Sequence, residues 1–152
     1  MTELSQIAQW LNKMNVDFYQ DEDDFTIHLS YLQKIDGIYE AKIELIDDIL
    51  KVVITAQIKL SAIISLMAEL SQINQSIYFT KIYLDIVDDS EPKIIFTYAI
   101  HAADDLTFNQ FSLSLASVEE EALQVIGELN SCELLNNKCR DTHQSIVPLV
   151  FH

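Results

Sequence analysis

Glycine, proline and cysteine are scarce in this 152-residue sequence, which holds only two of each. The isolated glycines, Gly37 and Gly127, exclude a glycine-rich loop that could cradle a phosphate. Cys132 and Cys139 fit reduced thiols better than a disulfide framework. The richest apolar stretch, around Leu60 to Leu70, is interrupted by serines and bounded by charge, so we expect no membrane span.

Positive charge is also scarce. Nine Lys and Arg stand against 24 Asp and Glu, which gives a formal net charge of -15 and a pI of about 4.3. Nucleic-acid phosphates and anionic membranes would be repelled by this field, so neither is an expected partner. Basic partners would be attracted, although such acidity can also serve only to keep a protein in solution.

The start of the sequence bears on location. Met1, Thr2 and Glu3 do not resemble the basic opening of a secretory signal. Together with the reduced state expected for the cysteines, this indicates a cytoplasmic protein.

The sequence contains residues that could bind a metal or act in catalysis, but they do not have the spacing of a known metal or catalytic site. The cysteines and His143 would share a face if a helix continued there, but the spacing is not that of a known zinc module, even with His152 added. The acidic run Asp21 to Asp24 lacks the ligand pattern of a calcium loop. No nucleophile motif accompanies the histidines. We therefore expect no catalytic residues, no metal, no cofactor and no enzymatic activity.

Hydrophobic periodicity predicts an α+β fold with an antiparallel five-stranded sheet, in the order α-β-β-β-α-β-β-α. Alternating apolar residues predict the strands, and apolar residues three or four apart predict the helices. The expected strands are 25–32, 38–46, 49–56, 80–87 and 93–100, and the expected helices are 3–15, 60–77 and 105–130. Residues 1–130 are expected to form a single domain, and 131–152 a C-terminal extension or tail with an apolar end.

The helix expected at 60–77 is apolar around most of its circumference. One stripe consists of Leu60, Ile63, Ile64, Met67 and Leu70, and polar side chains occupy only a narrow arc. A helix of this kind must be covered on more than one side. We expect the sheet to cover the first stripe and a second copy of the chain to cover the second. The expected dimer interface is therefore Ala62, Leu66, Ile73 and Ile77.

A family resemblance follows from the order of these elements. The run Leu66-Met67-Ala68-Glu69-Leu70, then Ile73-Asn74 leading into Lys81-Ile82-Tyr83-Leu84-Asp85, resembles the YbjN family of bacterial proteins. That family is similar in fold to the class I chaperones of type III secretion. The resemblance implies a two-layer or three-layer α+β domain, a homodimer and no enzymatic activity.

Two functions from different classes remain open. The first is a non-catalytic protein-binding module, chaperone-like or regulatory, that engages a polypeptide client. The second is a small-ligand-sensing or signalling domain with no chaperone role. His28 and Tyr83 lie on the polar phase of their strands and are candidates for contacting a partner, as is Trp10, although a core position suits the tryptophan better.

Overall fold

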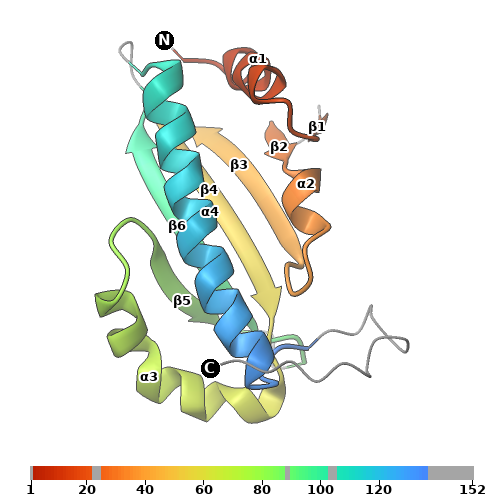
Figure 1. Cartoon of the computed structure of the whole chain (residues 1–152), viewed down its shortest axis with the longest axis vertical. Helices are drawn as coiled ribbons and strands as arrows, with labels where there is room; N and C mark the ends of the chain where they lie inside the picture. Colours follow the sequence, from red (N-terminus) through yellow and green to blue (C-terminus); the bar gives the residue numbers. More distant parts are fainter. Residues whose placement is uncertain (1, 22–24, 88–89, 103–105, 137–152) are drawn as a thin grey trace.

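The computed structural model describes residues 2–21, 25–87, 90–102 and 106–136. Its strands form one antiparallel sheet in the order β1-β2-β3-β4-β6-β5. Helices α1, α2 and α4 lie on one side of this sheet, and α3 lies at one end of it beside β5 (Figure 1). The elements are α1 (Leu4–Met14), β1 (Tyr19–Asp21), β2 (Thr26–His28), α2 (Ser30–Gln33), β3 (Glu40–Ile46), β4 (Ile49–Gln57), the short 3-10 helix η1 (Leu60–Ala62), α3 (Ile63–Gln75), β5 (Lys81–Asp85), β6 (Lys93–His101) and α4 (Phe108–Ser131).

The α+β class with an antiparallel sheet is confirmed, whereas the expected five strands and their order are wrong. The segment expected as one strand over 25–32 contains the short β2 followed by a turn of helix, α2. Leu29 and Leu32 are both buried. Residues three apart share a face in a helix but not in a strand, so the helical turn is what brings both leucines to the core.

The sixth strand is β1, in the acidic segment between the expected helix at 3–15 and the expected strand at 25–32, where no strand was expected. Tyr19 pairs with His28 across the β1–β2 ladder, and their rings stack with centroids 4.7 Å apart. Residues 22–24 of that segment lie outside the described residues. The strand thus depends on pairing with β2, which local sequence pattern does not indicate.

Two tight turns flank β3. Asp47 and Asp48, both with positive φ (49° and 64°), join β3 to β4 as the two-residue connection that suits the twist of a hairpin. Gly37 has a φ of +98°, and a Cβ there would lie 2.8 Å from Ile126 Cγ2 and 3.1 Å from Leu135 Cδ1. Glycine is therefore required at this turn for its backbone and for the close approach of α4.

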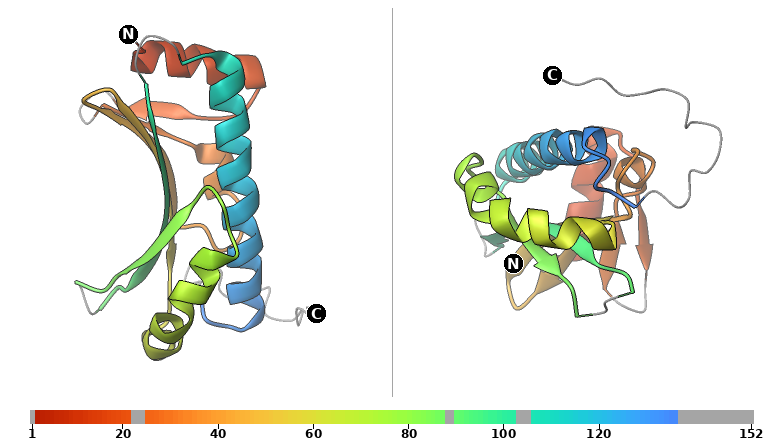
Figure 2. Two further views of the ribbon diagram at one scale, coloured as in Figure 1. Left: turned by 90° about the vertical axis from the view of Figure 1, so that its left-hand side faces the viewer. Right: turned by 90° about the horizontal axis from the view of Figure 1, so that it is seen from below.

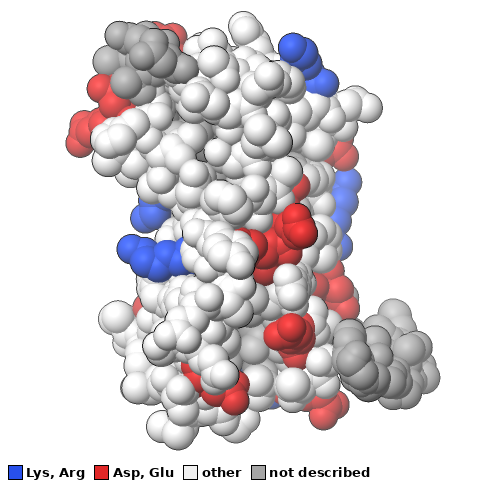
Figure 3. Space-filling view, turned by 60° about the vertical axis from the view of Figure 1, so that its left-hand side comes forward, with Lys and Arg blue, Asp and Glu red and all other residues white. Residues whose placement is uncertain are grey.

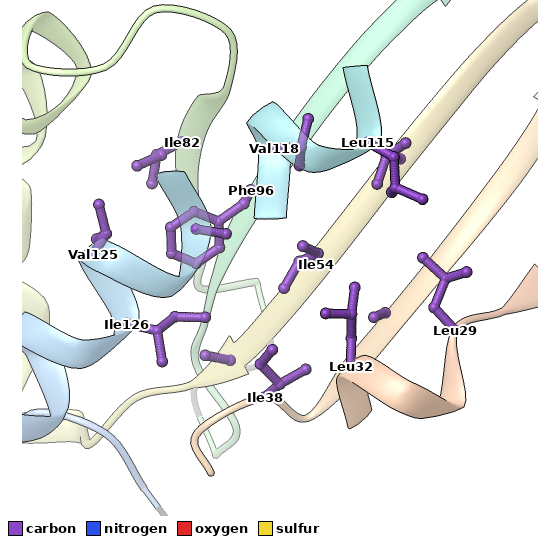
Figure 4. Close-up of a cluster of buried hydrophobic side chains, with 14 of the residues drawn as sticks. Leu29, Leu32, Ile38, Ile54, Ile82, Phe96, Leu115, Val118, Val125 and Ile126 are labelled. Atoms are coloured by element: carbon purple, nitrogen blue, oxygen red, sulfur yellow. The ribbon is translucent and has the colours of Figure 1, made fainter. Parts of the chain in front are cut away.

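The core lies between α4 and the sheet (Figure 4). The three-four spacing that predicted this long helix places its apolar seam against the sheet, with Leu115, Val118 and Ala122 fully buried. The sheet contributes Ile54 and Phe96, which are also fully buried. Thr107 caps the helix with Gln110 in a capping box.

The opposite face of the sheet is not covered by any helix of the described residues. Figure 2 shows that the sheet curves so that this face is concave and turned away from α4. We call it the open face. Because side chains alternate along a strand, it carries every second residue of β3, β4, β5 and β6.

Residues just beyond α4 pack back onto the domain. The Lys59 N–H donates to the Leu134 carbonyl, the Asn136 N–H donates to the Gln57 carbonyl, and Leu135 is buried. The part of the expected tail that follows residue 136 lies outside the described residues. The expected boundary between domain and tail at residue 130 stays a prediction.

Candidate functional site

The helix α3 exposes a broad surface without charge. Nine residues of η1 and α3 are exposed and uncharged, and we call them the contact face. They are Leu60, Ser61, Ile64, Ser65, Met67, Ala68, Ser71, Gln72 and Gln75. The only charged residue from 60 to 75 is Glu69. Glu69 is exposed as well, so in a chain with a net charge of -15 the ten exposed residues of η1 and α3 carry a single charge.

Large apolar side chains make this surface costly to leave in water. Ile64 is 77% exposed, and Leu60 and Met67 are more than half exposed. Tyr78 and Phe79 follow α3 directly and add exposed aromatic surface, 89% and 50% exposed. Figure 3 shows this flank of the molecule, where uncharged surface predominates and charged side chains occur in small groups. Contiguous exposed apolar surface of this kind marks an interaction site.

The stripe expected to pair with a second copy is covered by the chain itself. Ala62 and Leu66 are 0% exposed, and Ile73 and Ile77 are partly buried against the core. The assignment of a dimer interface to Ala62 and Leu66 is therefore corrected, because a side chain without exposed surface cannot contact another folded copy. Leu60, Ile64 and Met67 of the first stripe are exposed to solvent instead.

The outer edge of β5 is partly closed by side chains from two helices. Asn74 of α3 accepts from the Ile82 N–H (2.9 Å) and donates to the Ile82 carbonyl (3.0 Å). Glu121 of α4 accepts from the N–H groups of Tyr78 and Thr80, at 2.7 and 2.8 Å, and from that of Phe79. An edge protected in this way offers little room for an added strand.

The electrostatics of Glu121 follow from this arrangement. Burial by itself would raise the pKa of the Glu121 carboxyl, but the hydrogen bonds from the Tyr78, Phe79 and Thr80 backbone outweigh burial. The pKa of Glu121 is therefore lowered, and the ionised form is the one that holds the α3–β5 turn.

A second perturbed pair joins α2 to α4. The Tyr31 hydroxyl donates a hydrogen bond to Glu119. Burial raises the pKa of Tyr31, and the hydrogen bond and charge of Glu119 raise it further. Burial also raises the pKa of Glu119, which the Tyr31 hydrogen bond opposes. The described residues contain no group of three potential metal ligands, and we interpret this pair as a packing contact.

The open face has a neutral centre surrounded by a ring of four lysines, with the carboxylates of Glu40, Glu44 and Asp85 among them. At its centre, Val53 and Thr55 of β4 lie opposite Thr97 and Ile95 of β6, and all four are between 5 and 9% exposed. We call these four residues the central block. The register places Lys42 beside Val53, Lys81 beside Thr97, Lys51 beyond one end of the block and Lys93 beyond the other.

Two of the partner-contact candidates from the sequence lie on the open face, and the third lies in the helix layer. Tyr83 is on the open face beside Ile95, and it is 39% exposed. His28 is on the same face, beside Lys42 and toward the β1 edge, where its ring stacks on that of Tyr19. Trp10 packs on Phe111 of α4 with ring centroids 5.4 Å apart, which places it in the helix layer as a packing residue. The structure thus keeps Tyr83 near a surface that a partner could reach and does not bring the three together.

Asn74 and Glu121 hold the junction between α3 and β5, a role that the sequence did not reveal. Their partners are backbone groups of a strand and a turn that approach only in the folded chain. The contact face did have a signal, the absence of charge from 60 to 80 apart from Glu69. Cys132 is exposed, and the other members of the zinc set considered from sequence, Cys139, His143 and His152, lie outside the described residues.

These features define an α+β protein with an open sheet face and a helix whose exposed residues, apart from Glu69, are uncharged. Residues 3–131 match the model of the YbjN family, described as "Putative bacterial sensory transduction regulator". The chain is 33% identical over 132 residues to "Uncharacterized protein YbjN" of Escherichia coli strain K12, covering 87% of this chain and 84% of the relative. The YbjN protein of Shigella flexneri matches to the same extent. The chain belongs to the YbjN family, which confirms the resemblance seen in the sequence.

Solved structures agree with this assignment. "Crystal structure of YbjN, a putative transcription regulator from E. coli" superposes with a TM-score of 0.84 at 32% identity, covering 90% of this chain and 96% of that one. An uncharacterized protein from Methanothermobacter thermautotrophicus superposes with a TM-score of 0.60 at 14% identity, covering 84% of this chain and 96% of that one. The second similarity concerns the fold alone. Within the described residues, no helix has the length and apolar character needed to cross a bilayer.

Proposed function

We propose that this protein is a non-catalytic protein-binding module, chaperone-like or regulatory, that acts by engaging polypeptide chains. The observation that carries this proposal is the contact face, nine exposed uncharged residues on a chain with a net charge of -15. Removing apolar surface from water contributes about 25 cal/mol per Å². A surface with Ile64 and Met67 exposed gains this contribution only when another chain covers it.

A second copy of the chain is one partner that this surface suits. Two strongly acidic copies repel each other across most of their surfaces, and the contact face carries no charge to repel. Small side chains at Ser61, Ser65 and Ala68 lie beside the large ones at Ile64 and Met67. Under two-fold symmetry, small residues of one copy can receive large residues of the other.

The area that a stable interface requires is a reason to include Tyr78 and Phe79 in the proposed dimer interface. The 16 residues from 60 to 75 extend about 24 Å as a helix. Stable interfaces bury about 800 Å² on each partner, more than one short helix provides. Tyr78 and Phe79, directly after α3, supply further exposed area. We therefore include them in the proposed dimer interface.

The regulatory label of the family fits action through protein contacts. The E. coli relative with a crystal structure is described as "a putative transcription regulator". For this chain, a charge of -15 disfavours contact with DNA phosphates, so any such role would be exerted through a protein partner. A cytoplasmic location and the absence of catalysis belong to this proposal. The alternative is a small-ligand-sensing domain.

Sedimentation tests the proposed use of the contact face. The wild-type chain, of 17.4 kDa, should sediment as a dimer over a wide concentration range. Ile64→Asp places a carboxylate in the interface and should give a folded monomer, because Ile64 is already exposed in the single chain. Leu113→Asp is the matched control: Leu113 is also exposed, but on α4, and this variant should remain dimeric.

Two outcomes would contradict the proposal. A wild-type chain that is monomeric at all concentrations would remove self-association through the contact face. Equal dissociation of the Ile64→Asp and Leu113→Asp variants would assign the effect to net charge and not to the contact face.

A further inference from the structure

We infer that the open face binds an extended polypeptide segment carrying two carboxylates on either side of two apolar residues. This inference rests on the proposed protein-binding function and identifies the chemistry of the partner. It concerns a surface separate from the contact face. The open face lacks a covering helix among the described residues, and its curvature makes it concave (Figure 2).

The distribution of lysine is the first observation. Seven Lys and Arg lie within the described residues, and four of them are on the open face. They are Lys42, Lys51, Lys81 and Lys93. The same register places Glu40, Glu44 and Asp85 on this face, so its charge is close to balanced, in contrast to the net charge of -15 of the whole chain.

The charge around the central block is only partly balanced. Lys42 lies 3.6 Å from Glu40 and 4.0 Å from Glu44, so its charge is met by its own strand. No carboxylate of the described residues lies within ion-pair distance of Lys51, Lys81 or Lys93, although Glu44 lies opposite Lys51 and Asp85 lies opposite Lys93 in the ladders. The Lys93 ammonium donates to the Glu91 carbonyl at 3.4 Å, and each of the three ammonium groups keeps N–H donors for an acidic partner. At physiological ionic strength, screening over about 8 Å limits repulsion from the distant acids.

The central block supplies the apolar half of the site. Val53, Thr55, Ile95 and Thr97 present methyl groups on a flat β surface. They sit recessed between longer side chains, which include Tyr83. Apolar side chains of a partner can contact this floor while its acids reach the surrounding lysines.

The spacing specifies the order of residues in the partner. Lys51 and Lys93 lie three two-residue steps apart along the strand direction. Each step is about 6.8 Å, so the lysines are about 20 Å apart along the strands. An extended segment repeats its side chains at the same interval. It would place acids at positions 1 and 7 and apolar residues at positions 3 and 5.

The edges of the sheet favour binding on the face. Asn74 already makes the hydrogen bonds that an added strand would make at Ile82, and Glu121 occupies the N–H of Thr80. The opposite edge strand, β1, has only three residues. A partner would therefore lie across the open face, where side chains rather than backbone groups recognise it.

The probe for the test is the synthetic peptide Glu-Ser-Val-Ser-Val-Ser-Glu. It is titrated into isotopically labelled full-length protein while backbone amide signals are followed by NMR. The expected result is a set of shifts confined to β4, β5 and β6 around the central block. The same peptide with Gln in place of both Glu should reach less than a tenth of the binding-site saturation that the Glu peptide reaches at equal concentration.

Matched triple variants separate local recognition from net charge. Replacing Lys51, Lys81 and Lys93 by Gln should raise the apparent Kd at least tenfold. Replacing Lys13, Lys34 and Lys59 by Gln changes the net charge equally and should leave the Kd within twofold. Equal effects of the two triple variants, equal binding of the two peptides, or shifts elsewhere would overturn the inference.

A negative result with the peptide would overturn the open-face inference without contradicting the proposed function. If the peptide causes no shift while wild type still dimerises through the contact face, only the open-face inference is overturned. If the open-face signals move with protein concentration alone, the occupant is a second copy, and the acidic-segment inference is again overturned.

Discussion

The side-chain amide of Asn74 makes with Ile82 both hydrogen bonds that a neighbouring strand would make. Its Oδ1 accepts from the Ile82 N–H at 2.9 Å, and its Nδ2 donates to the Ile82 carbonyl at 3.0 Å. The same Nδ2 lies 3.2 Å from the Leu70 carbonyl of its own helix. One residue therefore fixes α3 against β5 and closes part of the sheet edge.

Asn74→Ala should destabilise the protein and open this edge. Leaving the part-buried Ile82 backbone groups without these partners costs about 1–3 kcal/mol. An exposed strand edge also promotes pairing between molecules. Urea denaturation should show the loss of stability, and light scattering should show increased aggregation. Gln72→Ala, an exposed change on the same helix, should show neither effect.

Glu121→Gln should lower stability at neutral pH. The folded-state pKa of Glu121 is below its usual value of 4.5, so its carboxylate stabilises the fold above that pH. This contribution is lost as the pH falls through the folded pKa. Because the side chain is largely solvated, we expect a loss of about 1 kcal/mol at pH 7, which disappears in acid. Denaturation at several pH values measures it, with Glu120→Gln as the control.

Glu119→Gln should change the folding stability at neutral pH in the opposite direction. The pKa of Glu119 is raised by burial, so its contribution to stability is present below pH 4.5 and is lost as the pH rises through the folded pKa. Gln removes the buried charge and still accepts the Tyr31 hydrogen bond. We expect a stability at pH 7 that is unchanged or raised by up to about 1 kcal/mol. A clear loss at pH 7 would show that the ionised carboxylate stabilises the α2–α4 contact.

The two glycines should respond to alanine with opposite signs. Gly37→Ala meets Ile126 Cγ2 at 2.8 Å and has a φ of +98°, so it should cost about 1–3 kcal/mol. Gly127 lies within α4 with nothing within 4 Å of a new Cβ, so Gly127→Ala should gain up to about 1 kcal/mol. For a chain of this size, 1 kcal/mol corresponds to about 2–4 °C in Tm. Thermal unfolding of both variants gives the comparison.

Long regular elements could be predicted from the sequence because their patterns repeat over many turns. The three-four spacing predicted α4 over 105–130, and the helix spans Phe108–Ser131 although Phe111 to Leu115 also alternate. The expected helix at 3–15 and the strands β3 to β6 are confirmed within a few residues. Helix α2 escaped prediction because a single turn holds too few residues to establish a period.

The candidate site was less accessible to sequence reasoning. The pattern showed two apolar stripes on α3, but only the folded chain shows that Leu66 faces inward and Ile64 outward. The lysine ring depends on the register that places Lys42 and Lys81 on either side of β4 and β6, and strands distant in sequence set that register. Asn74 and Glu121 act through backbone groups of other elements, which leave no local signal.

Site-specific photo-crosslinking in living cells tests the protein-binding claim most directly. A benzophenone amino acid is placed at Ile64 on the contact face, at Tyr83 on the open face and at Leu113 on α4, all of which are exposed. We predict a crosslinked homodimer from position 64, a crosslink to a different polypeptide from position 83, and neither from position 113. Absence of any crosslinked polypeptide at positions 64 and 83 would contradict the account and favour the small-ligand alternative.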